Sequence, residues 1–291
     1  MVESPEEMTE GYKKALEQIL LVSGDTELMS APAYYGASMK APTLDARASC
    51  VSVIQDEIGH GHIAYRLLED LGYDRHELVF GREPHEFRNT YGFDQPIENF
   101  AELVVGHGLW DRAGIVLLSD VHENSSYAPW KRELTKVGKE EQFHLRHGET
   151  WMRRLANKSE STKQKVQEAV DWMFPIAIEW FGLPDDLKKH DDQLEYAIKG
   201  KTNDELRQDW MDSAVPLAEE LDLGVPAHYD EEQEEYVLEY DLPIAYSPEE
   251  KRWHYDEHIS WDDVIDRWRS RGPAIEDYVS LIQTGEIGAV A

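Results

Sequence analysis

The feature of this 291-residue chain that most restricts its fold is a Glu-x-x-His motif that occurs twice. The first copy runs from Glu57 to His60, and the second runs from Glu141 to His144. Side chains three residues apart lie on the same face of an α-helix, so the carboxylate and the imidazole of each copy can reach one metal ion. A single copy would be weak evidence, because an acidic chain contains such a motif by chance.

A further acidic residue stands at the same distance before each motif. Glu27 lies thirty residues before Glu57, and Asp111 lies thirty residues before Glu141. Thirty residues of an antiparallel helix hairpin can run to the end of one helix, turn, and return to the same height. Each hairpin would therefore bring one more carboxylate to the level of its motif. A doubled motif with a doubled spacing predicts one shared site.

Apolar residues recur at helical spacing over most of the first 180 residues. We expect helices over 12–22, 25–39, 44–71, 96–122, 129–155 and 161–181, with Gly24 separating the first two. Beyond residue 185 the pattern weakens. There we expect helices over 202–221, 248–261 and 261–282, around an acidic stretch at 229–246 that is ambiguous for strand. The chain has no glycine-rich phosphate loop and no alternation of strand and helix, so the expected class is all-α.

Two such hairpins supply four helices, four carboxylates and two imidazoles, which is the ligand set of ferritin-like di-iron carboxylate proteins. We therefore expect a ferritin-like four-helix bundle over residues 1–185, with a helical extension over 186–291 that packs on it. Hard oxygen donors with only two imidazoles favour iron or manganese over zinc. Asp120 is an alternative to Asp111 on the third helix. A different interpretation, surface acids with helix-capping histidines, also stays open.

Several neighbours of the motifs need their own interpretation. Asp56 and Glu140 directly precede the motif glutamates, and we expect them to hold the histidine N–H groups or to lie in solvent. We expect the next histidines to be packing or surface residues, and the helical tryptophans to lie in the core rather than act as redox relays. These residues are His62, His147, Trp151, Trp172 and Trp180.

The composition excludes several classes of partner and site. The chain has 29 Lys and Arg against 59 Asp and Glu, a formal net charge of −30, so nucleic acid and anionic membranes are unexpected partners. The charge predicts an acidic shell typical of proteins that work at high salt, or else a docking surface for a basic partner. One cysteine, Cys50, allows no disulfide framework and no cysteine-held cluster. No apolar run approaches the ~20 residues of a membrane span, so we expect a cytoplasmic protein.

Four segments carry a resemblance to a known family. They are Ala41–Leu44, Val53–Gly61, Ser126–Pro129 and Lys139–Glu149, with Asp-Glu-x-Gly-His-Gly and Lys-Glu-Glu-x-Phe-His at their centres. With these motifs the chain resembles the catalytic component of phenylacetyl-CoA epoxidases, ferritin-like di-iron oxygenases of phenylacetate degradation. The resemblance covers about residues 20–155. It implies six ligands for two iron ions: Glu27, Glu57, His60, Asp111, Glu141 and His144.

The resemblance also implies an activity and a set of partners. The enzyme would be a monooxygenase that uses O₂ to epoxidise the aromatic ring of phenylacetyl-CoA. Electrons would come from NADPH through a separate flavin/iron–sulfur reductase, and the complex would include a structural sister subunit of the same fold and a small accessory subunit. The sister has lost most ligands, so the complete set here favours the catalytic component. The alternatives are an oxygenase for another aryl- or acyl-CoA thioester, or a non-catalytic scaffold.

Coenzyme A carries several negative charges, so its binding to an acidic chain requires a local basic surface. The sequence offers candidates for this surface on the predicted helix that carries the second motif, both before and after the motif. They are Lys131, Arg132, Arg146, Arg153 and Arg154.

Overall fold

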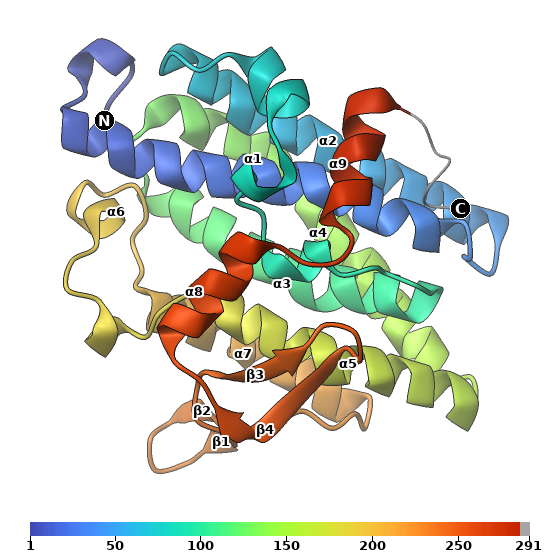
Figure 1. The fold of residues 1–291 in the computed structure, drawn as a ribbon. Coiled ribbons are helices and arrows are strands. Elements are labelled where there is room, and N and C mark those ends of the chain that lie inside the picture. The colour runs from blue at the N-terminus through green and yellow to red at the C-terminus, as the bar shows by residue number, and fades with distance from the viewer. Residues whose placement is uncertain (286–291) are drawn as a thin grey trace.

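A computed structural model describes residues 1–285, and its centre is a bundle of four long helices (Figure 1). These are α1 (Glu10–Ser38), α2 (Leu44–Asp70), α3 (Phe100–Asn124) and α4 (Ala128–Ala156). Helices α1 and α2 form one hairpin and α3 and α4 form the other, and the bundle closes where α2 meets α4 and α1 meets α3. This arrangement confirms the predicted all-α, ferritin-like bundle.

The helix starts follow the capping residues. The hydroxyl of Thr43 accepts the N–H of Ala46 and starts α2 where predicted. Helix α3 starts at Phe100 rather than near residue 96, because the Asn99 side chain caps it. The predicted break at Gly24 is wrong.

Helix α1 runs without a break through Gly24, for a packing reason. A Cβ at Gly24 would lie 2.8 Å from the ring of Tyr65 on α2. The glycine therefore lets α1 and α2 approach closely rather than ending a helix. This close approach matters for the site, because Glu27 and Glu57 face each other across the same pair of helices.

The segment between α2 and α3 is irregular and is anchored to α1 by a buried ion pair. It contains short turns at Glu77–Gly81, Pro84–Glu86 and Tyr91–Asp94. Arg82 donates to Asp25 from Nη1 to Oδ2 at 2.9 Å and from Nη2 to Oδ1 at 2.6 Å, and Asp25 has no exposed surface. This bidentate contact fixes the segment over the bundle.

Two further helices, which are not part of the four-helix bundle, pack against α3. Helix α5 (Glu160–Trp180) and helix α7 (Asn203–Glu220) lie close to their predicted bounds. The indole of Trp110 on α3 donates to the carbonyl of Met173, and the indole of Trp210 donates to the carbonyl of Leu109. Buried tryptophans usually satisfy their N–H in this way, so the contacts fix α5 and α7 against the bundle.

The C-terminal part mixes helices with two antiparallel hairpins. Its elements are α6 (Asp192–Glu195), β1 (Ala227–Asp230), β2 (Glu235–Leu238), β3 (Ile244–Ser247), β4 (Arg252–His258), α8 (Trp261–Ser270) and α9 (Ile275–Thr284). Strand β1 pairs with β2, and β3 pairs with β4. The stretch 229–246, which was ambiguous for strand, therefore contains β2 and parts of β1 and β3.

The predicted helix over 248–261 is wrong, because residues 252–258 form β4 instead. Trp253 is buried between exposed Arg252 and half-buried His254, and its indole donates to the carbonyl of Trp172. The predicted helix over 261–282 is two helices, α8 and α9, separated at Gly272-Pro273. The division into domains at residue 185 stays a prediction. Among residues 1–285, no helix is both long and apolar enough to cross a bilayer.

Candidate metal centre

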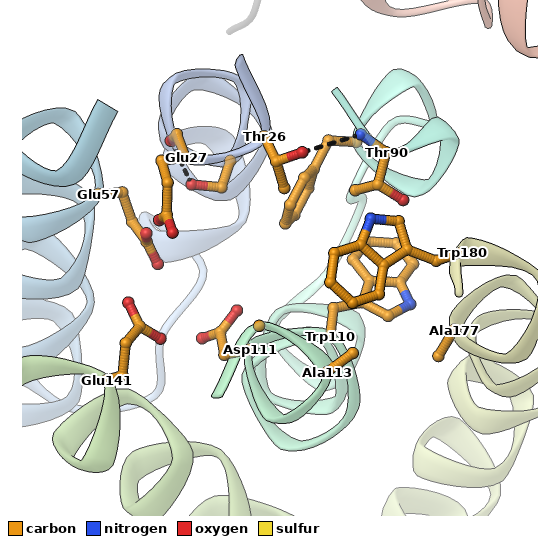
Figure 2. A pocket seen from close by; sticks show the side chains of 13 residues that line it. Thr26, Glu27, Glu57, Thr90, Trp110, Asp111, Ala113, Glu141, Ala177 and Trp180 are labelled. Atoms are coloured by element: carbon orange, nitrogen blue, oxygen red, sulfur yellow. Dashed lines mark hydrogen bonds between the residues drawn. The ribbon is translucent and has the colours of Figure 1, made fainter. Parts of the chain in front are cut away.

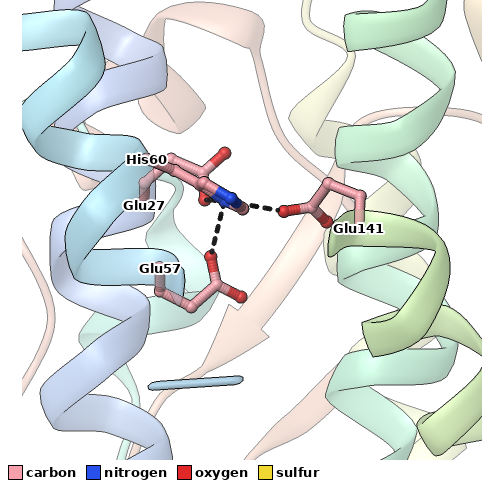
Figure 3. A group of neighbouring side chains, drawn as sticks. All are labelled: Glu27, Glu57, His60 and Glu141. Atoms are coloured by element: carbon pink, nitrogen blue, oxygen red, sulfur yellow. Dashed lines mark ion pairs between the residues drawn. The ribbon is translucent and has the colours of Figure 1, made fainter. Parts of the chain in front are cut away.

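The six predicted ligands meet in the middle of the bundle, and all four helices contribute to them. Helix α1 contributes Glu27 and α3 contributes Asp111, while α2 and α4 each contribute one Glu-x-x-His motif. Figure 2 shows the four carboxylates directed into one common space. Figure 3 shows the His60 ring between Glu27, Glu57 and Glu141.

The donor atoms form two overlapping groups. One group is Glu27, Glu57, His60 and Glu141, and the other is Glu57, Asp111 and His144; within each, one donor atom per residue lies within 4.8 Å of the others. His60 Nδ1 lies 3.0 Å from Glu141 Oε1, and His144 Nδ1 lies 3.3 Å from Glu57 Oε1. Glu57 belongs to both groups, so it can bridge two ions.

Burial and mutual charge shift the pKa values of this cluster strongly. Burial raises the pKa of Asp111 to about 8, and burial together with the charge of Glu27 raises the pKa of Glu57 well above its ordinary value. Burial opposes the charge of His60, but contacts with Glu141 and Glu27 prevail and raise its pKa to about 12. Without a metal, the cluster therefore holds its negative charge by binding protons.

The donor set fits a pair of divalent cations. Among the described residues, four buried atoms of the cluster lack a hydrogen bond: His60 Nδ1, His144 Nδ1, Glu141 Oε1 and Asp111 Oδ2. Buried polar atoms rarely lack a hydrogen bond, and all four belong to residues of the two donor groups. Four carboxylates carry a charge that two divalent ions neutralise, and oxygen-rich donors with two imidazoles suit iron or manganese.

The outer nitrogens of both histidines face carboxylates on the opposite helix. His60 Nε2 lies 3.1 Å from Glu140 Oε2, and His144 Nε2 lies 3.4 Å from Asp56 Oδ2. The prediction that these two acids hold the histidine N–H groups is confirmed. Such a contact fixes the tautomer that leaves Nδ1 free to bind a metal, and it raises the basicity of the ring.

Tyr34 is a site residue that the sequence reasoning missed. Its hydroxyl donates to Asp111 Oδ1 at 2.9 Å, and its side chain has no exposed surface. Tyr34 stands seven residues after Glu27 on α1, two helical turns along the same face, which is the signal that could have found it. Asp120, the alternative to Asp111, lies elsewhere: its Oδ2 accepts the N–H of Gly200.

A small cavity of about 40 Å³ adjoins the carboxylates. Its other walls are mainly aromatic and small apolar side chains, among them Phe93, Trp110, Ala177 and Trp180. Figure 2 labels the last three of these. Trp172 is buried in the core as predicted, whereas Trp180 is half-buried and forms part of this wall. Apolar walls beside a polar cluster exclude water from one side of it.

Comparison with known proteins identifies the family of this chain. The family model described as phenylacetic acid catabolic protein matches residues 1–259. The chain belongs to the phenylacetic acid catabolic protein family. The resemblance inferred from the motifs is therefore confirmed, and this family member is an enzyme of the oxidoreductase class with a role in phenylacetate catabolism.

Two curated relatives of this family member come from Escherichia coli (strain K12), and both are components of 1,2-phenylacetyl-CoA epoxidase. The A component of that epoxidase is 32% identical over 239 residues, which cover 81% of this chain and 77% of the relative. The C component is 26% identical over 144 residues, which cover 48% of this chain and 57% of the relative. The match to the A component is both longer and higher in identity.

Proposed function

We propose that this chain is the catalytic di-iron component of an oxygenase that epoxidises the aromatic ring of phenylacetyl-CoA with O₂. The observation that carries the proposal is the complete set of six donors in two groups that share Glu57, placed beside an aromatic-lined cavity. Five of these donors are buried and Glu27 is half-buried. The match to the A component of a phenylacetyl-CoA epoxidase supports the same substrate and reaction.

In this proposal each site residue has a defined task. Glu27, Glu57, His60 and Glu141 would hold one iron, and Glu57, Asp111 and His144 would hold the second. A pair of irons bound there would supply the redox chemistry of the overall reaction, in which O₂, two electrons and two protons give one oxygen atom to the ring and one molecule of water.

The surrounding residues position these ligands and the substrate. Glu140 and Asp56 keep the histidine rings oriented, and the Tyr34 hydroxyl holds Asp111. The walls formed by Phe93 and Trp110 would keep the aromatic ring near the ligands and exclude water.

The electrons have to come from another protein. The single cysteine, Cys50, is buried and cannot hold an iron–sulfur cluster by itself. We therefore propose NADPH as the electron source, through a separate flavin/iron–sulfur reductase. The similarity to two different components of one epoxidase supports a complex that contains a sister chain of the same fold and a small accessory protein.

Reconstitution tests the proposal directly. The iron-loaded chain is mixed with the sister, accessory and reductase proteins of its own genome, NADPH, O₂ labelled with heavy oxygen, and phenylacetyl-CoA. We expect a ring epoxide that carries one labelled oxygen, detected by mass spectrometry. Turnover of another thioester but not of phenylacetyl-CoA would overturn the substrate, and a chain that binds no iron would be a scaffold.

A further inference from the structure

A cleft of about 700 Å³ lies directly behind one wall of the cavity at the carboxylates. It is formed by the segment 85–91, the end of α5 and the helix α8 with the residues that follow it. Thr90 and Trp180 line both the cleft and the cavity. These two side chains are therefore the partition between the outer cleft and the candidate metal centre.

The charged side chains of this cleft that lack a close ion-pair partner are positive, although the chain as a whole has a formal net charge of −30. Arg88 is exposed and makes no ion pair among residues 1–285, and the exposed Arg269 has only Asp266 at 3.8 Å. Arg271 is buried and paired with Asp94. The one acid in the lining, Glu179, is itself buried and neutralised by Arg267, which lies outside the lining.

The size, charge and aromatic content of the cleft suit one class of ligand. A volume of several hundred Å³ is typical of sites for ligands much larger than phenylacetate. Guanidinium groups bind phosphates well, and the half-buried indole of Trp268 in the lining offers a flat surface for a base. A nucleotide thioester has phosphates, a base, and an acyl group at the end of a long arm.

We propose that the cleft binds the coenzyme A part of the substrate, and that Trp180 with Thr90 forms the gate through which the acyl group reaches the carboxylates. This inference rests on the proposed function, since it places the substrate of that same site. The cavity of about 40 Å³ has room for a few water molecules, so an aromatic ring enters only when part of the wall moves.

Trp180 is the movable half of this gate. It is the last residue of α5, it is half-buried, and Gly182 two residues later has a φ of +87°, where the helix ends. Thr90 is held more firmly, because its N–H donates to the Thr26 hydroxyl at 3.2 Å (Figure 2). A rotation of the Trp180 indole toward the cleft would join the two spaces.

In this proposal the cleft, and not the group of basic residues on α4, is the coenzyme A site. Arg132 is paired with Glu3, and Arg153 is paired with Glu149 and Glu220. Arg146 is exposed on α4 and makes no ion pair among the described residues. Arg146 therefore matches Arg88 in being exposed and without an ion pair, and its substitution serves as the control for the cleft variants.

Calorimetric titration of the metal-free full-length chain with coenzyme A tests the cleft without any turnover. We expect the double variant Arg88→Glu/Arg269→Glu to weaken binding about tenfold or more, and Arg146→Glu to stay within about twofold of the wild type. The reverse result would place the coenzyme on α4. Equal affinity in all three proteins would overturn the cleft as the binding site.

Activity of the reconstituted complex tests the gate. Trp180→Ala is expected to raise kcat/KM for a bulkier naphthylacetyl-CoA relative to phenylacetyl-CoA by about tenfold, whereas the conservative Trp180→Phe changes the ratio much less. An unchanged ratio in Trp180→Ala would overturn the gate. If coenzyme A binds as expected but no epoxide forms, the cleft stands and the oxygenase proposal fails. If epoxide forms while the cleft variants bind normally, the oxygenase stands and the cleft fails.

Discussion

Metal binding to the cluster should release an unusually large number of protons. In the metal-free protein at pH 7, the raised pKa values keep His60 and His144 protonated and Asp111, with a pKa of about 8, mostly protonated. Burial opposes the charge of Glu141, but its contacts with the two histidines prevail and lower its pKa to about 2, so it is already ionised. Ligands bind a metal as carboxylates and neutral imidazoles, so filling both positions should release about three protons per chain from these three residues.

Calorimetry measures this number. Manganese(II), which is not oxidised under these conditions, is titrated into the metal-free protein at pH 7 in buffers of different ionisation enthalpy. The dependence of the observed heat on the buffer gives the proton count. We expect at least about three in the wild type and in the control Asp120→Asn, and about one fewer in Asp111→Asn. Release of one proton or none would refute the assignment of these residues as a buried ligand cluster.

The same protons set the pH dependence of stability. In Asp111 and His60 the folded-state pKa lies above the unfolded value, so both groups stabilise the metal-free fold at low pH. That contribution falls between about pH 4 and 8 for the aspartate and above about pH 6.5 for the histidine. The Tm of the metal-free protein should therefore decrease from pH 6 to pH 9, with a flatter profile after metal is added.

Five substitutions, in three separate experiments, test other parts of the account. Glu141→Ala should abolish iron retention with helix content unchanged, and Glu140→Ala should only weaken it; equal losses by metal analysis would contradict the distinction between ligand and positioning residue. Arg82→Met leaves a buried carboxylate unpaired and should cost about 3–5 kcal/mol of unfolding free energy in urea, whereas a loss below about 1 kcal/mol would refute that role. Gly148→Ala places a Cβ 2.5 Å from the α3 backbone and should cost about 1–3 kcal/mol, while Gly138→Ala, which meets open space, should not destabilise.

The bundle and most of the site were predictable because they follow from periodic, local patterns. The spacing of Glu27 to Glu57 and of Asp111 to Glu141 requires only that each helix pair be antiparallel. The opposed contacts of Asp56 and Glu140 follow from the same register. The role of Gly24 could not be predicted from the neighbouring sequence, because it depends on the ring of Tyr65 on the adjacent helix.

The remaining elements depend on contacts between distant segments. Strand β4 forms where a helix was predicted, since Trp253 packs against Trp172 on α5 and its strand pairs with β3. Thr90 and Trp180, the residues of the proposed gate, line one cavity. The irregular segment that carries Thr90 is held over the bundle by contacts that include the Asp25 and Arg82 pair. No periodic pattern in the sequence marks either contact.

The most direct test of the central claim is the iron content and Mössbauer spectrum of the purified chain after anaerobic loading. The account predicts about two irons per chain in an exchange-coupled pair, and a loss of both in His60→Ala. A single uncoupled iron, or iron that stays bound after this substitution, would contradict a dinuclear centre at these residues.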